Sequence, residues 1–147
     1  MGAVSADVHE IAAARLRQVA QRYTSARRAV VDVLVAADRP LTIPEVLARR
    51  PGLAQSSAYR NLAVLEQAGV VHRIVTSDEY GRYELAEEVG QHHHHLICSR
   101  CGGVSDFIVA EDVEHDLDRA LASAARRHGF AIDHHRLDLI GTCPDCR

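Results

Sequence analysis

All four cysteines of this 147-residue chain fall into two CxxC pairs. Cys98 and Cys101 form the first pair, and Cys143 and Cys146 form the second. Two residues between paired cysteines allow both sulfurs to bind one tetrahedral Zn²⁺ at about 2.3 Å. A redox dithiol would not need a second matched pair. The spacing therefore predicts a closed four-thiolate Zn²⁺ site with a structural role, which ties the C-terminal tail to a region without a large core.

Four consecutive histidines, residues 92–95, lie just upstream of the first cysteine pair and lead into an apolar segment. In a strand, alternate side chains point to opposite faces, so His93 and His95 share one face while His92 and His94 share the other. Neutral imidazole, together with carboxylate, binds Zn²⁺, Fe²⁺, Mn²⁺ or Ni²⁺. The run predicts at least one metal site suited to sensing, and the alternative is a solvated polar strand.

The first half of the chain has the pattern of several helices followed by a hairpin. Apolar residues at helical spacing, punctuated by capping residues, Pro and Gly, predict helices over residues 5–22, 24–37, 43–50 and 57–68. Thr42 and Glu45 match a capping box, and Ser56 is the expected cap of the last helix. Two strands, 70–75 and 81–85, flank a turn at 76–79. This order predicts a winged helix.

The second half has a different pattern, with strands expected over residues 93–97, 104–109 and 132–140 and a helix over 111–128. The polar segment 86–91 contains a glycine and is the expected hinge. We therefore predict an α+β fold with two domains. An N-terminal winged-helix DNA-binding domain spans residues 1–86, and a small α/β domain with the four-cysteine zinc site spans residues 92–147.

Charge and composition exclude several classes of protein. The net charge is −3, but residues 1–86 carry 11 Arg against 9 acidic residues, so the basic character lies in the first half. This balance disfavours sequence-blind coating of DNA and allows DNA binding through a local face. No stretch approaches the roughly 20 apolar residues that span a bilayer, and no export signal is evident. The sequence predicts a cytoplasmic protein that does not contact membranes.

One face of the fourth predicted helix is polar. Ser57, Tyr59, Arg60 and Asn61 are expected to point largely outward, as the residues of a recognition helix in the major groove do. Arg27, near the start of the second helix, is placed to contact phosphate. The alternative interpretation is an ordinary solvated face.

In combination these motifs resemble the ferric uptake regulator family of metal-dependent repressors, from about Arg22 to Cys146. The segments that carry the resemblance are 22–27, 57–62, 83–85, 92–101, 127–130 and 141–146. The resemblance implies a homodimer that forms through its C-terminal domain and binds an operator in double-stranded DNA. It also implies repression of metal-uptake genes when metal is bound. Tyr59 would contact a base and Arg60 the DNA backbone.

The resemblance also implies metal ligands. Besides the structural Zn²⁺ at the four cysteines, a sensory site would draw on His72, Glu84, His93, His95 and Asp106. A second site would use His92, His94 and His135 with an acid that is either Asp118 or Glu114. Pro40 occupies the position of a ligand histidine in many iron sensors, and no cysteine is left for the sensory site that many zinc sensors build. The sensed ion is therefore open between Zn²⁺ and Fe²⁺, with Mn²⁺ as a further candidate.

Alternative functions remain at this stage. A peroxide sensor of the same family would use Fe²⁺-promoted oxidation of the site histidines. A zinc-stabilised DNA-binding or adaptor protein would ignore other metals. A hydrolase is disfavoured because no HExxH or similar arrangement supplies an acid-base partner, so the sequence predicts a protein that is not an enzyme.

Overall fold

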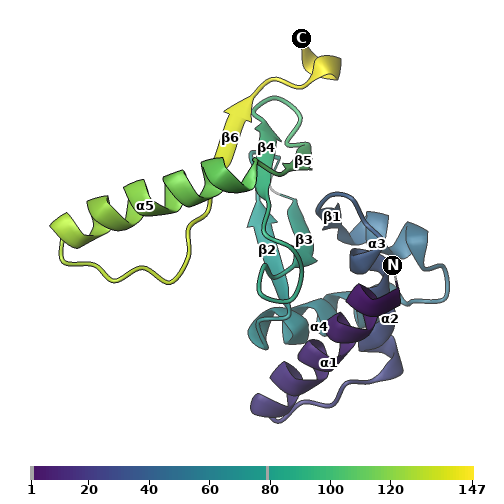
Figure 1. Cartoon of the computed structure of the whole chain (residues 1–147). Coiled ribbons are helices and arrows are strands. Elements are labelled where there is room, and N and C mark those ends of the chain that lie inside the picture. The colour runs from purple at the N-terminus through teal and green to yellow at the C-terminus, as the bar shows by residue number, and fades with distance from the viewer. Residues whose placement is uncertain (1, 79) are drawn as a thin grey trace.

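The computed structural model describes residues 2–78 and 80–147, so Glu79 of the predicted 76–79 turn lies outside the described residues (Figure 1). The elements of the first half follow the order predicted for a winged helix. They are α1 (Gly2–Gln18), α2 (Ser25–Val35), β1 (Leu41–Thr42), α3 (Ile43–Arg49), α4 (Gln55–Gln67), β2 (Val71–Val75) and β3 (Gly81–Leu85). Strands β1, β3 and β2 form an antiparallel sheet in that order.

The second half contains β4 (His94–Cys98), β5 (Val104–Phe107), α5 (Glu111–Arg127), β6 (Asp138–Gly141) and a 3₁₀ turn, η1 (Pro144–Cys146). Its sheet has the order β5-β4-β6, with β4 antiparallel to β5 and parallel to β6. The α+β class predicted from the sequence is confirmed. Strand β6 is shorter than the predicted 132–140, because only Asp138–Gly141 pairs with β4.

Helix boundaries differ from the predictions where backbone conformation overrides the sequence pattern. Helix α1 ends at Gln18 and not near residue 22, because Ala20 adopts a left-handed conformation (φ 56°) and the amide of Gln21 donates to the carbonyl of Leu16. That arrangement closes a helix C-terminus. Ser56 does not cap α4. Ala54 occupies the N-cap with an extended backbone, and no side chain supplies the capping hydrogen bond.

The capping box of α3 is present and includes an ion pair. The Thr42 hydroxyl accepts from the Glu45 amide, and Glu45 accepts from the Thr42 amide at 2.8 Å and from Arg39 Nη2 at 2.7 Å. Burial raises the pKa of Glu45, but the hydrogen bonds from Arg39 and Thr42 outweigh it and lower the pKa to about 2. The carboxylate thus stabilises the folded state most when it is ionised.

We expect this pair to make the winged helix acid-sensitive. Because the folded pKa lies below the unfolded value of 4.5, Glu45 contributes stability above that pH which is lost as the pH falls toward 2. Glu45→Gln keeps an N3 side chain that can cap but has no charge to lose. Urea unfolding at about pH 6 and about pH 3 should show a larger stability loss in the wild type than in Glu45→Gln. Equal losses would contradict this role for Glu45.

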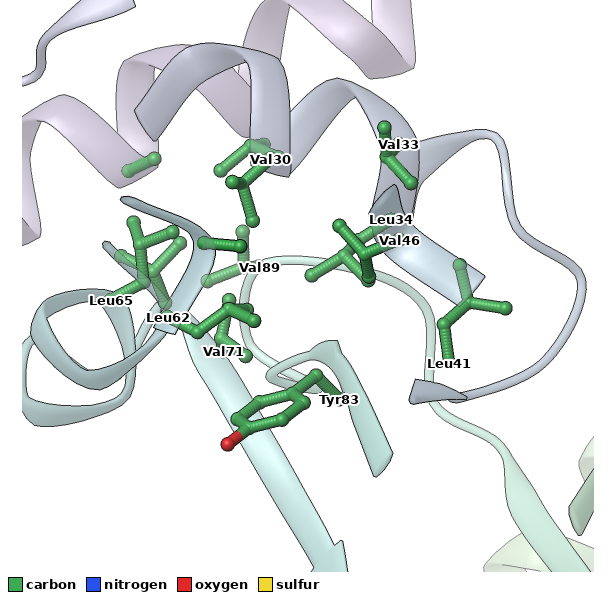
Figure 2. Close-up of a cluster of buried hydrophobic side chains, with 14 of the residues drawn as sticks. Val30, Val33, Leu34, Leu41, Val46, Leu62, Leu65, Val71, Tyr83 and Val89 are labelled. Atoms are coloured by element: carbon green, nitrogen blue, oxygen red, sulfur yellow. The ribbon is translucent and has the colours of Figure 1, made fainter. Parts of the chain in front are cut away.

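The main hydrophobic core lies in the first half, where α2, α3 and α4 pack on the β1-β3-β2 sheet and α1 packs on α2. Figure 2 shows Val30 of α2 on the side of Leu62 and Leu65 of α4, and Leu34 of α2 beside Val46 of α3. Val89, which follows β3, is only 4% exposed and belongs to the same cluster. The segment that joins the two halves is therefore anchored in the N-terminal core at Val89.

The second half buries far less. Helix α5 projects away from the rest of the chain and has no buried residue (Figure 1). Large apolar side chains along it and along β6 are exposed, among them Val113, Leu121, Leu139 and Ile140. No helix among the described residues is long and apolar enough to cross a membrane. The apolar stripe of α5 and the exposed face of β6 therefore lack a covering partner within the described part of this chain.

Candidate metal centres

The four cysteines converge although the two pairs are more than 40 residues apart. Cys98 ends β4, Cys101 follows in the adjacent turn, Cys143 precedes η1, and Cys146 is the last residue of η1. All four sulfur atoms lie within 4.8 Å of one another, and none forms a disulfide. The Sγ atoms of Cys101 and Cys143 are 3.8 Å apart. Zn–S bonds of about 2.3 Å in a tetrahedron place sulfurs about 3.8 Å apart, so the donor set fits Zn²⁺.

Backbone amides favour the thiolate form of Cys98, whereas neighbouring sulfurs raise the pKa of Cys101 and raise that of Cys146 to about 12. The amides of Cys143 and Gly103 donate to the sulfurs of Cys98 and Cys101, each at 3.4 Å. Backbone hydrogen bonds from Cys101, Cys143 and Arg100 lower the pKa of Cys98 to about 6. Metal binding requires the deprotonated sulfur, so a low thiol pKa favours it.

A second cluster joins the two halves of the chain. Glu84 lies on β3, His95 on β4 and Asp106 on β5, with His93 just before β4. Their ligand atoms lie within 4.8 Å of one another. Glu84 Oε2 is 2.8 Å from Nε2 of His93 and 3.0 Å from Nε2 of His95. The Asp106 carboxylate lies 3.9 to 4.0 Å from the same two nitrogens.

The Nδ1 atoms of the two histidines in this cluster each have a hydrogen-bond partner elsewhere in the chain. His93 Nδ1 lies 2.7 Å from the carbonyl of Gln91, and His95 Nδ1 lies 3.0 Å from Asp138. Sequence reasoning missed Asp138, whose place follows from the β4–β6 register that pairs it with His95. Both Nε2 atoms therefore face the carboxylates. A carboxylate behind a ligating imidazole orients the ring and strengthens its bond to metal.

Charge in this cluster is strongly coupled. The hydrogen bond to Glu84 raises the pKa of His93 to about 9. Burial raises the pKa of Glu84, but the hydrogen bonds with His93 and His95 outweigh it and lower the pKa to about 2. Burial raises the pKa of Asp106, and its Oδ1 atom is buried without a hydrogen-bond partner. Two imidazoles and two carboxylates, one of which has an unsatisfied buried oxygen, form a donor set that fits a divalent cation.

His72 does not join this cluster. It lies on β2 opposite Glu84 and lines a cavity of about 330 Å³ that also reaches His95. Its Nε2 atom is buried without a hydrogen-bond partner. Burial lowers the pKa of His72, and nearby Arg136 lowers it further. His72 therefore lies beside the sensory cluster, outside the set of four, in surroundings that disfavour its charged form.

A third cluster lies on the other face of β4. His92, His94, Glu114 and His135 bring their ligand atoms within 4.8 Å of one another. Glu114 Oε1 is 3.0 Å from Nε2 of His92 and 2.9 Å from Nε2 of His135, while Oε2 is 2.8 Å from Nε2 of His94. The contact to His135 lacks hydrogen-bond geometry, and Nδ1 of His94 is buried without a partner. Three imidazoles converging on one carboxylate fit a metal ion.

Glu114, and not Asp118, is the acid of this cluster. Asp118 lies one turn further along α5 and sits 2.9 Å from Nδ1 of His135, behind the ring. Glu87 holds the same position behind His92, at 3.0 Å from Nδ1. Sequence reasoning did not identify Glu87, because its role depends on how the segment after β3 folds back toward α5. The two carboxylates orient the imidazoles.

We expect substitutions of Glu114 and Asp118 to weaken metal binding to different degrees. Glu114→Gln should nearly abolish metal binding at this cluster, because one side chain faces all three imidazoles. Asp118→Asn should keep the metal and weaken binding about 10- to 100-fold, the usual effect of removing a carboxylate behind a ligand histidine. Competition titration with a chromophoric chelator measures both, after the tightly bound zinc has been counted. A greater loss in Asp118→Asn than in Glu114→Gln would make Asp118 the ligand.

The predicted DNA-binding residues divide into two groups. Tyr59 and Arg60 are exposed on α4. The expectation that Asn61 points outward is wrong, because its side chain is buried between α2 and α4. It accepts from Arg27 Nε at 3.3 Å and donates to Ser57 Oγ at 3.1 Å. Asn61 therefore positions Arg27 and Ser57 on the surface and does not itself face solvent.

Comparisons with known proteins agree with this architecture. The sequence is 29% identical over 135 residues to the peroxide operon regulator of Bacillus subtilis, covering 89% of this chain and 88% of that protein. It is 27% identical over 138 residues to the peroxide-responsive repressor PerR of Staphylococcus epidermidis, covering 91% and 87%.

Solved structures show the same fold. The ferric uptake regulator Fur of Helicobacter pylori superposes with a TM-score of 0.70 at 23% identity, over 97% of this chain and 93% of that one. A zinc-bound manganese uptake regulator gives a TM-score of 0.62 at 27% identity, over 93% and 98%. The profile of the ferric uptake regulator family matches residues 18–140. This chain belongs to the ferric uptake regulator family.

Proposed function

We propose that this protein is a metal-responsive transcriptional repressor that binds operator DNA as a homodimer in the cytoplasm. One observation carries the proposal. Glu84 comes from the winged-helix hairpin, whereas His93 and His95 come from the second half, and the three side chains meet in one donor set. A ligand held there binds both halves at once and therefore favours their closed arrangement. The protein acts by binding, and it is not an enzyme.

The residues of the sensory cluster would each have a defined task. Glu84, His93, His95 and Asp106 would hold a divalent cation, which supplies coordinate bonds between the two halves. Asp138 and the carbonyl of Gln91 keep the rings of His95 and His93 turned toward those bonds. With the halves fixed, the α4 helices of two protomers can sit about 34 Å apart, one helical turn of DNA. Tyr59 and Arg60 would then reach a base and the DNA backbone.

The homodimer is supported by the apolar surface of the second half. Val113 and Leu121 on α5 and Leu139 and Ile140 on β6 are all exposed in the single chain. Helix α5 buries nothing, although its apolar residues recur at helical spacing. A second copy of the chain would cover this surface symmetrically.

The donors limit the ions that the sensory cluster could sense. The sensory cluster offers only nitrogen and oxygen, which suit Zn²⁺, Fe²⁺ or Mn²⁺, whereas the four sulfurs suit Zn²⁺. Fluorescence anisotropy with the upstream DNA of its own gene tests the proposal. Protein that retains only tightly bound zinc is titrated anaerobically with each ion. We expect one ion to tighten DNA binding about 5- to 150-fold. DNA binding that is equal with and without added metal would overturn it.

Peroxide sensing is a second candidate, favoured by the names of the relatives from Bacillus subtilis and Staphylococcus epidermidis. A nitrogen and oxygen site can hold Fe²⁺, which promotes oxidation of neighbouring imidazoles by peroxide. Mass analysis of the iron-loaded protein after peroxide treatment should then find added oxygen on His93 or His95. Loss of DNA binding without such oxidation would exclude this variant.

A further inference from the structure

The tip of the β2–β3 hairpin contacts the zinc loop, defined here as residues 98–103. The hairpin runs from α4 toward β4 and β5 (Figure 1). The Thr76 hydroxyl lies 3.2 Å from the carbonyl of Gly102, and the Ser77 hydroxyl donates to the carbonyl of Ser99 at 3.4 Å. In a winged helix this hairpin is the wing. Here its tip is attached to the other half of the chain.

The contact is closely fitted at Gly102. This glycine has a φ of +70°, and a Cβ atom placed there would lie 2.5 Å from Asp78 Cγ and 2.8 Å from Thr76 Oγ1. Both distances are too short for real atoms, so the wing tip occupies the space that any side chain would need. Only glycine suits both the backbone conformation and the close approach.

Hydrogen bonds within the hairpin also hold the wing tip in place. Arg82 donates from Nη2 to Asp78 Oδ2 at 2.6 Å and from Nη1 to Asp78 Oδ1 at 2.9 Å. Its Nη1 also donates to Thr76 Oγ1 at 2.8 Å. The Arg82 side chain is only 10% exposed. A bidentate pair of this kind is among the more rigid polar contacts, so Asp78 cannot easily move away from Gly102.

The hairpin therefore meets the second half of the chain at two places. Glu84 contacts His93 and His95 near the base of β3, and Thr76 and Asp78 contact the zinc loop at the tip. Only the first contact belongs to the sensory cluster. The second contains no metal ligand from the hairpin and depends on the position of a loop that the four cysteines hold.

We propose that the contact of Thr76 and Asp78 with Gly102 is the pivot on which the DNA-binding half turns when the sensory site fills or empties. The wing tip then serves as an interdomain strut. This assignment gives the zinc site a task in signalling besides stability, because the cysteines hold the surface on which the pivot rests. The expected effect of the pivot on DNA affinity rests on the proposed function, but the contact itself can be tested separately.

Gly102→Ala tests the pivot, and Gly129→Ala is its matched control. Gly129 has a φ of +75°, close to that of Gly102, but a Cβ atom there would meet nothing within 4 Å. Both variants carry similar backbone strain, and only the first disturbs the wing tip. Thr76→Val is a second variant, which removes the hydroxyl that faces Gly102 and changes no residue of the zinc loop. Zinc content is measured in each, so that an effect of lost zinc is recognised.

Hydrogen exchange followed by mass spectrometry reads the contact directly. In wild type and Gly129→Ala, amides of the wing should be protected both with and without added sensory metal, because the pivot persists in both states. Gly102→Ala and Thr76→Val should speed this exchange at full zinc content. In DNA titrations both should reduce the metal-dependent gain in affinity about tenfold.

Three results would overturn the pivot. The first is a wild-type wing that exchanges freely without sensory metal. The second is unchanged protection in both Gly102→Ala and Thr76→Val, and the third is an equal effect of Gly129→Ala. If the wild type instead shows a protected wing but no metal-dependent DNA binding, the proposed function fails while the strut stands.

Discussion

Cys98→Ser is expected to abolish tight zinc binding and to unfold the second half of the chain. A serine hydroxyl is a poor ligand for Zn²⁺, and Cys98 is the one buried member of the four. Structural Zn²⁺ sites contribute about 10 to 16 kcal/mol of apparent binding free energy, and this energy is available only to the folded form. The second half has little to replace it, since Val104 is the main buried apolar residue beyond Cys98 in that region.

Zinc content and thermal unfolding by circular dichroism measure this effect. The variant should contain less than one zinc per chain and should lose the transition of the second half. The helices of the first half should remain, because their core is separate (Figure 2). Ser105→Ala, at an exposed position on β5, is the control and should behave as the wild type. A variant with full zinc and an unchanged melting temperature would show that three thiolates suffice.

Sequence reasoning succeeded where the determining residues are neighbours in the chain. The Thr42 and Glu45 capping box is a pattern of four residues, and the structure contains both of its hydrogen bonds. The division of His92 to His95 into two sets that point in opposite directions follows from the two-residue period of an extended chain. The zinc site could be predicted from the two CxxC pairs without knowing how the chain runs between them, because structural Zn²⁺ takes four ligands.

Sequence reasoning failed where contacts between elements distant in the chain decide the position of a side chain. Asn61 has the polar character of a surface residue, but Arg27 from a different helix draws its side chain inward. The choice between Glu114 and Asp118 depends on how α5 lies against β4, which spacing along the helix cannot reveal. Asp138 acquires its role from a strand register that links it to His95 across 43 residues. Each miss reflects tertiary contact overriding a local pattern.

Strand β4 links all three metal clusters. His94 and His95 lie on its two faces, His92 and His93 come just before it, and its last residue is Cys98. Glu84 on β3 and Glu87, just after β3, each contact a histidine from one of the two sets. A shift of β4 relative to β3 would therefore alter both histidine clusters together. The two sites are expected to influence each other through this strand, since ligands that favour the same arrangement bind cooperatively.

Replacing both His93 and His95 by Ala should yield a folded protein that retains its zinc but gains no DNA affinity from metal. The variant loses half of the sensory donors, and the remaining two carboxylates from β3 and β5 form a poor site for a transition metal. Removing the imidazoles leaves Glu84 buried without its partners, which costs roughly 3 to 5 kcal/mol at most, because Glu84 can take up a proton. Typical domain stabilities of about 5 to 15 kcal/mol tolerate this cost.

Anisotropy titrations with and without added metal measure the result. A hundredfold gain in affinity in the wild type corresponds to about 2.7 kcal/mol of coupling between the metal and DNA sites, and the double variant should lose essentially all of it. His128→Ala, at an exposed position after α5, should retain the full gain. The His92 and His94 cluster stays intact in the double variant. Any metal-dependent gain that survives there would assign the sensory role to that cluster, because it is then the remaining complete set of nitrogen and oxygen ligands among the described residues.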